Sequence, residues 1–207
     1  KTGGVVTATL TGSISEVASL TTAATDVIAV TASGTFTGAS GVTALNTLAG
    51  KTAGVVTATV SGTASELGDL VIATTDAIAM TASGTQTGSS GVTAVNALGT
   101  ATAGVVTATL TGTITELGSL STAATDMIAV TASGTQTGSA GVTAVNALAG
   151  KTAGVVTATL TGTITELGSL TTAATDMIAV TASGTQTGSA GVTALNTLAG
   201  KTAGVVT

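Results

Sequence analysis

The 207-residue chain has no Cys, His, Pro, Trp, Tyr or Arg, and its only aromatic residue is Phe36. Histidine, cysteine, arginine and aromatic side chains supply most acid–base, nucleophilic, oxyanion-stabilising and stacking chemistry. Their absence argues against an enzyme, and we expect no catalytic residue, no cofactor site and no metal site. The absence of Cys leaves the redox compartment open.

Charge is also scarce, since 6% of the residues are charged and the net charge is -5. Nucleic acids and anionic membrane surfaces attract clustered Lys and Arg, so neither is an expected partner. The mean hydropathy is high (+0.67), but Thr or Gly interrupts every apolar run before it reaches the roughly 18 residues of a membrane span. Disordered chains combine low hydrophobicity with high charge, so this chain is expected to fold.

The chain consists of tandem copies of a 50-residue repeat. These copies are residues 1–50, 51–100, 101–150 and 151–200, and residues 201–207 begin a further copy. They align without a gap, so each residue would lie above its counterpart if the copies stack. We therefore predict a single solenoid array over residues 1–207, and we expect it to be a window from a longer array.

Each copy divides into two similar halves, which in the fourth copy are residues 155–176 and 177–204. Each half opens with strand-like alternation. The residues expected to face inward are Val156, Ala158 and Leu160 in one half and Ile178, Val180 and Ala182 in the other. The fold class that this pattern predicts is an all-β, right-handed parallel β-solenoid with two coils, of about 22 and 28 residues, per repeat. With strands about 4.8 Å apart, one repeat would advance the stack by about 9.6 Å.

An apolar spacing of three follows each strand pattern, at Ile164, Leu167 and Leu170 and at Val192, Leu195 and Leu198. Two alternatives fit it: a turn or two of helix, or a third strand face with a bent corner. A short helix would take Thr163 or Thr165 as its N-cap, with Glu166 in its first turn. Positive φ angles are expected where coils turn corners, at Gly162, Gly184, Gly188, Gly191 and Gly200.

The segments GVVTATLTGTITELGSLTTAATD (154–176) and GVTALNTLAGKTAG (191–204) resemble tandem tracts of very large bacterial repeat proteins. These proteins, of a cyanobacterial type, are secreted or displayed on the cell surface and are described as adhesin-like or haemagglutinin-like. The resemblance covers the whole chain. It implies an extracellular or cell-surface stalk and transfers no catalytic residue. The calcium-binding pattern G-G-x-G-x-D is absent, so calcium-driven folding is not implied.

Stacking would turn each repeated polar residue into a ladder. The ladders are Asp26, Asp76, Asp126 and Asp176; Glu16, Glu66, Glu116 and Glu166; and Asn46, Asn96, Asn146 and Asn196. Carboxylates suit calcium, but one per repeat recurs about 9.6 Å apart, too far for two to share an ion. We expect Asp to close a turn, Glu to help cap a short helix, and Asn to bond backbone groups at a corner.

The remaining charged positions follow the repeat less strictly. Asp69 occurs only in the second copy. The lysines at the repeat junctions are Lys1, Lys51, Lys151 and Lys201, and the third copy has Ala101 at this position. We therefore expect that no required site depends on the lysine.

Threonine at every second residue, as in TATLT and TQT, predicts outward rows of methyl and hydroxyl groups. On one flat face such rows would resemble the Thr ladders of β-solenoid ice-binding proteins, but here they are expected to cover several faces. Phe36 replaces the Gln found at Gln86, Gln136 and Gln186. That exchange predicts an outward position that is indifferent to polarity.

These observations favour a structural protein: a segment of an extracellular or cell-surface fibre, stalk or surface layer. Self-association by end-to-end stacking is expected, through unpaired strand edges. The alternative is a binding module, either an adhesin stalk that contacts a surface or glycan, or an ice-binding Thr ladder. An enzyme would need a non-repeated polar cluster, and the sequence contains none.

Overall fold

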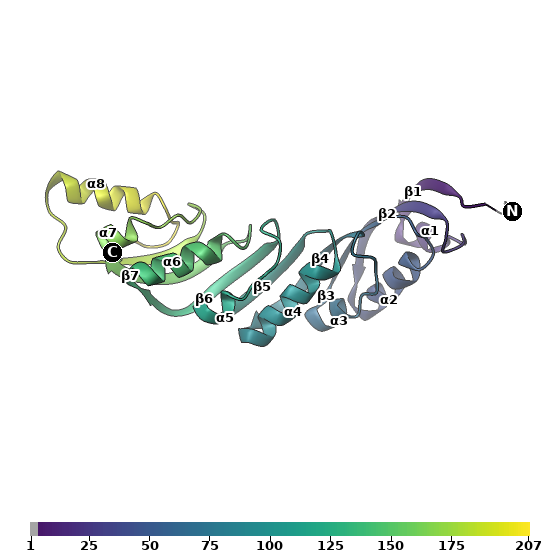
Figure 1. Ribbon diagram of the computed structural model, residues 1–207, viewed down its shortest axis with the longest axis horizontal. Coiled ribbons are helices and arrows are strands. Elements are labelled where there is room, and N and C mark those ends of the chain that lie inside the picture. Colours follow the sequence, from purple (N-terminus) through teal and green to yellow (C-terminus); the bar gives the residue numbers. More distant parts are fainter. Residues whose placement is uncertain (1–3) are drawn as a thin grey trace. The chain divides into compact units, whose positions relative to one another are not determined.

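The structure is a computed structural model that describes residues 4–207. Its strands form one eight-stranded sheet in chain order, from β1 to β8, and a helix follows each strand (Figure 1). The described strand pairs are parallel. The chain divides into two compact units, one of residues 1–84 with 94–108, and the other of residues 85–93 with 109–207.

The strands are β1 (Thr7–Ser13), β2 (Val27–Thr37), β3 (Val56–Thr63), β4 (Ala77–Thr87), β5 (Val106–Thr113), β6 (Met127–Thr137), β7 (Val156–Thr163) and β8 (Met177–Ser183). The helices are α1 (Ile14–Ala18), α2 (Gly38–Ala49), α3 (Ala64–Gly68), α4 (Gly88–Ala101), α5 (Ile114–Leu117), α6 (Gly138–Ala149), α7 (Ile164–Leu167) and α8 (Gly188–Ala199). Each half-repeat is therefore one strand and one helix, which confirms the division into two coils per repeat.

The helices make the expected all-β class wrong. In the second half of each repeat the apolar spacing of three lies on a long helix, as in α2, where Val42, Leu45 and Leu48 form the buried stripe. This segment is rich in Ala and Leu, which favour helix, and it has no run of β-branched residues. In the first half the same spacing begins on a short helix, as in α7, so the helical alternative is correct for both halves.

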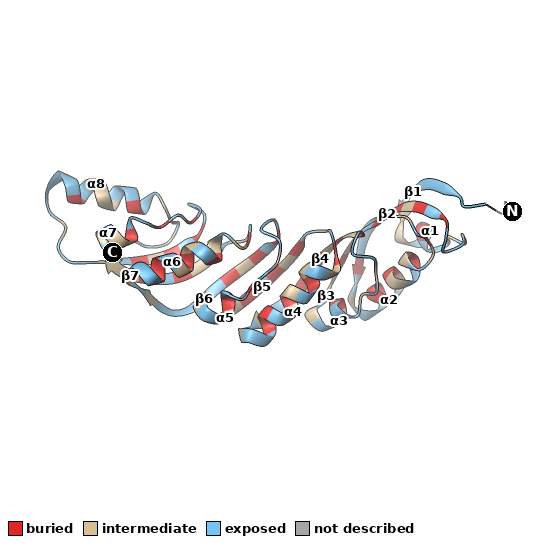
Figure 2. Ribbon diagram, in the orientation of Figure 1, coloured by how far each residue is buried: buried red, intermediate tan, exposed pale blue. Residues whose placement is uncertain are grey.

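Buried residues alternate with more exposed ones along the strands that follow β1 (Figure 2). In β7, Val156, Ala158 and Leu160 are buried, whereas Thr159 on the opposite face is exposed. The long helix α6 packs against β7 and shares its core. The expected inward residues of the first half are thus confirmed, and Ile178 and Val180 confirm the pattern in the second.

Strands β2 and β6 each contain a bulge. The bulge shifts the register with the next strand but leaves each side chain on the same face of the sheet. Thr31 pairs with Thr57 and Thr35 with Thr59, so β2 carries two more residues than β3 over this stretch. Two extra residues preserve the alternation. Phe36 consequently points inward, pairs with Val60 and is 3% exposed. The expectation that Phe36 lies outward was wrong: Phe36 follows the alternation of the buried Val30 and Ala32, and its exchange with Gln in the other copies does not indicate an outward position.

Positive φ angles occur at two of the five expected glycines, Gly184 (φ 83°) and Gly188 (φ 67°), which lie just after the end of β8 and at the start of α8. The prediction was wrong for Gly162, Gly191 and Gly200. Gly191 is required for a different reason: a Cβ there would lie 3.1 Å from the backbone carbon of Gln186. Close approach of the helix to the segment that precedes it, and not a positive φ angle, explains this glycine.

Candidate functional site: polar ladders and the outward face

The aspartate ladder ties a turn to the neighbouring coil. Asp76 is 3% exposed; its Oδ1 accepts a hydrogen bond from Val56 N (2.8 Å) and its Oδ2 accepts one from Ala73 N (3.0 Å). Asp26 and Asp176 make the equivalent pairs of bonds. The carboxylate therefore closes its own turn, as predicted, and also holds the first residue of the preceding strand.

A second ladder, which sequence reasoning missed, consists of buried threonines just after the repeat junction. Thr52 Oγ1 accepts hydrogen bonds from Ile28 N and Gly54 N, both at 2.9 Å, and lies 2.7 Å from Ile28 O. The same arrangement recurs at Thr102, Thr152 and Thr202. The available signal was a threonine present in every copy outside the alternating stretches.

The glycine two residues later shows how tightly these coils approach. A Cβ on Gly54 would lie 2.4 Å from the carbonyl carbon and oxygen of Ile28, a distance that real Cβ atoms essentially never show. The Thr52 hydroxyl and the Gly54 backbone, which has no side chain, thus both occupy the narrow space between adjacent coils. This contact requires both residue types.

The asparagine ladder bonds backbone groups at a corner, as predicted. Asn46 Nδ2 donates to Asp69 O (3.0 Å), and Asn46 Oδ1 accepts from Val71 N (2.8 Å). Asn146 makes the same pair of bonds with Ser169 O and Thr171 N. Each amide therefore satisfies one donor and one acceptor of a loop that belongs to the next coil.

The glutamate ladder caps two helices at once. Glu66 Oε2 accepts from Thr63 N (2.7 Å) and from Thr63 Oγ1 (2.9 Å), which forms a capping box at α3 and confirms the predicted role. Its Oε1 accepts from Ala39 N (3.2 Å) in the first turn of α2, a helix whose own N-cap, Thr37, makes no side-chain cap. The neighbouring coil thus supplies the missing cap.

These bonds stabilise the charged carboxylate. The Thr63 backbone N–H, and then the Thr63 hydroxyl, lower the pKa of Glu66 below its ordinary value. Glu116 and Glu166 have lowered pKa values through the N–H and hydroxyl of Thr113 and Thr163. For Glu16 the Ser13 hydroxyl contributes most to the lowered pKa, followed by the Ser13 backbone.

The lysines bind carbonyl groups at the ends of the short-helix segments. Lys51 Nζ donates to Ala18 O (2.7 Å), the last residue of α1, and Lys151 Nζ donates to Leu120 O (2.7 Å). A cation at this end of a helix is favourable. Lys1 lies outside the described residues. Ala101 ends α4 at this position of the third copy, so the lysine supplements the coil contact and does not create it.

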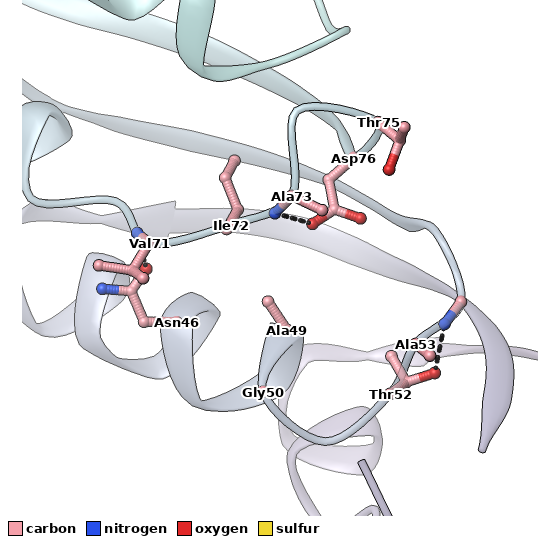
Figure 3. A pocket seen from close by; sticks show the side chains of 11 residues that line it. Asn46, Ala49, Gly50, Thr52, Ala53, Val71, Ile72, Ala73, Thr75 and Asp76 are labelled. Atoms are coloured by element: carbon pink, nitrogen blue, oxygen red, sulfur yellow. Dashed lines mark hydrogen bonds between the residues drawn. The ribbon is translucent and has the colours of Figure 1, made fainter. Parts of the chain in front are cut away.

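A groove lies between the helix end of one coil and the loop of the next (Figure 3). It has a volume of about 410 Å³ and is lined by Asn46, Thr52 and Asp76 and by the apolar Val71 and Ile72. The three polar side chains already bond the backbone, as the preceding paragraphs describe. The second unit has an equivalent groove of about 300 Å³, in which Thr171 replaces Val71.

The polar side chains of this groove bond the backbone of the chain itself. Its acid and amide oxygens accept hydrogen bonds from chain N–H groups. Within residues 4–207 there is no cluster of three or more His, Cys, Asp or Glu side chains that could hold a metal ion. No helix in the same residues is long and apolar enough to cross a membrane.

The outward face of the strands is uncharged. In the described residues every Lys, Asp and Glu lies outside the strands. The strand residues on this face are mainly Thr, Ser and Ala; Thr131 pairs with Thr157, and Thr161 with Thr181. The strand threonines therefore lie on one face and not on several as expected, because the strands form a single open sheet.

Comparisons with protein-family models, with curated proteins and with solved structures found no match. The arrangement itself defines a repeat protein with strand–helix units in a single open parallel sheet. The resemblance to bacterial surface repeats stays a prediction.

Proposed function

We propose that this chain is a structural spacer: a right-handed solenoid that forms a stiff segment of an extracellular or cell-surface fibre or stalk. The observation that supports this proposal best is the use of the polar ladders. Asp, Asn, Glu and the buried Thr of each repeat bond the backbone of a neighbouring coil, so the repeated polar residues serve stacking.

Stacking of this kind couples each coil to its neighbours only. Such arrays gain stability from interfaces between adjacent units, so length can be extended without redesign of the coil. A right-handed crossover is the general preference for parallel strands joined through helices. With two strands per repeat, each repeat would add about 9.6 Å to the reach of the array.

The edge of β8 illustrates how a further coil is added. Val180 N donates to Val205 O (2.7 Å) and Thr207 N donates to Val180 O (2.8 Å). Val30 N donates to Val55 O (2.9 Å) in the same way inside the array. A β-strand edge that accepts residues 205–207 would also accept the equivalent residues of another molecule, which supports end-to-end self-association.

Electron microscopy of arrays with two, four and eight copies of residues 151–200 tests the spacer function. We expect rods whose length grows by about 9.6 Å per added repeat, with thermal stability that rises with copy number. As a control, Gly154→Ala and its equivalents in every copy should prevent close stacking and abolish the rods. Particles whose longest dimension does not increase linearly with copy number would contradict the proposal.

A binding function is the second candidate, because the outward face is uncharged and presents rows of Thr. An ice-binding or surface-binding role would use these rows and not the ladders. Thermal hysteresis of the purified chain tests the ice-binding form directly. Its loss in the Thr31→Lys, Thr131→Lys double variant would locate the activity on this face.

A further inference from the structure

Helix α8 has the same apolar stripe as the long helices before it, but most of this stripe is uncovered. Val42 of α2 and Val142 of α6 are 3% and 2% exposed, whereas the equivalent Val192 of α8 is 59% exposed. Val145 of α6 is fully buried, and the equivalent Leu195 is partly exposed. The strand of the next coil covers the earlier stripes, since α2 contacts β3 and α6 contacts β7. Within residues 4–207 no strand follows α8.

Strand β1 shows the reverse, an inward side that no helix covers. Val6 is 39% exposed and Ala8 is exposed, whereas the equivalent Val56 and Ala58 are 1% and 5% exposed. In β3 and β7 the covering element is the long helix of the preceding coil, and the described residues contain no such helix before β1. The helix face (Val192, Leu195 and Asn196) and the strand face (Val6, Ala8, Leu10 and Glu16) are thus the two halves of one contact.

The polar ladders are also divided between these two faces. Glu66 Oε1 accepts a hydrogen bond from Ala39 N, at the start of the preceding long helix (3.2 Å). Among the described residues, the carboxylate of Glu16 bonds only Ser13, through Oε2. Asn196 is exposed on α8, at the position where the asparagine ladder bonds the loop of the next coil. The helix face therefore offers the amide, and the strand face offers the helix-capping carboxylate.

The edge of β8 is only partly paired. β2 is eleven residues long, and its residues 35–37 pair with residues 59–61 of the next strand. β8 is seven residues long, and residues 205–207 lie beside its first part. No strand of the described residues pairs with residues 185–187. In the register of β2 with β3, their partners would be the equivalents of residues 9–11 of β1.

We propose that the helix face of one copy binds the strand face of a second copy, so that the contact between molecules repeats the contact between coils. Inside the second unit, Leu160 of β7 lies against α6, where a Cβ on Gly141 would be 3.1 Å from its Cδ1. A second copy supplies Leu10 in place of Leu160 and Glu16 in place of Glu166. This interface rests on the proposed spacer function, for which it names the groups that join one molecule to the next.

Docking also requires an exchange at the edge of β8. Residues 5–7 and 205–207 have the same sequence, Val-Val-Thr, and equivalent places in the repeat. β1 of the second copy therefore replaces residues 205–207 on β8, and identical residues make the same backbone bonds again. The net gain comes from the pairing of residues 185–187 with residues 9–11 and from the removal of two apolar faces from water.

Because the two faces differ, the contact is heterologous, and a chain blocked on one face can still bind through the other. Val192→Lys blocks the helix face and Ala8→Lys blocks the strand face. Both side chains are already exposed, so the fold of the isolated chain should persist, which circular dichroism verifies. Thr197→Lys is the matched control on α8. Thr197 is exposed, and so is the equivalent Ala147 of α6, a helix that a strand covers.

Sedimentation velocity of the 207-residue chain measures the result. We expect the parent chain and Thr197→Lys to assemble into masses of several chains, each of 19.1 kDa. Each blocked variant alone should sediment at the mass of one chain. Its dissociation constant should rise by at least about tenfold, because a lysine buried in an apolar contact loses its hydration. An equimolar mixture of the two blocked variants should reach the mass of two chains and no more, since only one pair of intact faces remains.

Three outcomes overturn this interface. Blocked variants that assemble like the parent chain do so, and so does a mixture that stays at the mass of one chain. A parent chain that is monomeric at every concentration also overturns it, and assigns both faces to a partner other than this chain. An assembly that responds to neither lysine would be joined by the edge of β8 alone, without docking of α8.

These results are distinguishable from a failure of the spacer function. Covalent arrays that lengthen by about 9.6 Å per repeat, together with a monomeric parent chain, support the spacer function and overturn the interface alone. Arrays that do not lengthen contradict the spacer function, whereas dimerisation of the two blocked variants in the mixture would still support the interface.

Discussion

The loops between coils and the outward face of the strands use threonine for different purposes. In the loop between α2 and β3, Thr52 is buried and its hydroxyl bonds the backbone of an adjacent coil, whereas Thr159 on the outward face of β7 is exposed. At Thr52, the geometry of the hydrogen bonds between coils determines the side chain. At Thr159, only strand propensity and whatever contacts the surface constrain the side chain. Repetition of a residue therefore has two origins in one molecule.

Removal of a core side chain on the helix-covered side should give the strongest contrast with the outward side. Leu160 is fully buried and lies near Gly141 of α6, where a Cβ would be 3.1 Å from its Cδ1. We expect Leu160→Ala to lower the free energy of unfolding by about 2–5 kcal/mol. The adjacent Thr159→Ala should change it by less than about 0.5 kcal/mol. Urea unfolding, followed by circular dichroism, measures both, and equal losses would show that the two faces do not differ.

Substitution in the aspartate ladder should have the next largest effect. Asp76→Ala leaves Val56 N and Ala73 N without their carboxylate acceptor, at a position that is 3% exposed. We expect a loss of about 2–3 kcal/mol in the free energy of unfolding. Asp69→Ser is the matched control, because Asp69 is exposed and Ser occupies the equivalent position of the other copies, so it should be neutral. A neutral Asp76→Ala would mean that the carboxylate does not join the coils.

The asparagine ladder is less buried and should contribute less. Asn146→Ala removes the bonds to Ser169 O and Thr171 N, and we expect a loss of about 1 kcal/mol. Asn146→Asp keeps an acceptor for Thr171 N but loses the donor to Ser169 O. Near neutral pH its loss in the free energy of unfolding should therefore be at least as large as that of Asn146→Ala. Asn196→Ala, at an exposed equivalent position, serves as the control and should have little effect.

Much of this fold could be predicted from the sequence, because alternation and repeat length report directly on strands and on stacking. Val156, Ala158 and Leu160 follow a period of two, and the Thr163–Glu166 spacing indicates a capping box. The long helices were harder to predict. Their segments begin with small residues that also suit turns, and the apolar spacing of three fits a helix or a bent strand corner equally well.

The candidate site was predicted in its parts but not in its connections. The roles of Asp, Glu and Asn follow from residue type and position. The partners of Thr52 and the second contact of Glu66 lie 24 to 27 residues away in the chain, and they become visible only when the coil register is known. Phe36 shows a different limit, since the alternation of Val30 and Ala32 places it inward, whereas its exchange with Gln in the other copies led to the outward prediction.

Charge neutralisation of the glutamate ladder should have the smallest effect, because these carboxylates are accessible to water. Their folded-state pKa values lie below the unfolded value of about 4.3, so the stabilisation is present above that pH and is lost as the pH falls through the folded pKa. Gln can still form the capping box through its one oxygen, but its NH2 group cannot accept a second hydrogen bond, so substitution of all four Glu by Gln removes the charge and the cap of the neighbouring long helix. We expect thermal midpoints measured from about pH 5 to pH 3 to fall less steeply in this variant than in the parent chain. Parallel profiles would show that the capping bonds, and not the charge, carry the contribution of this ladder.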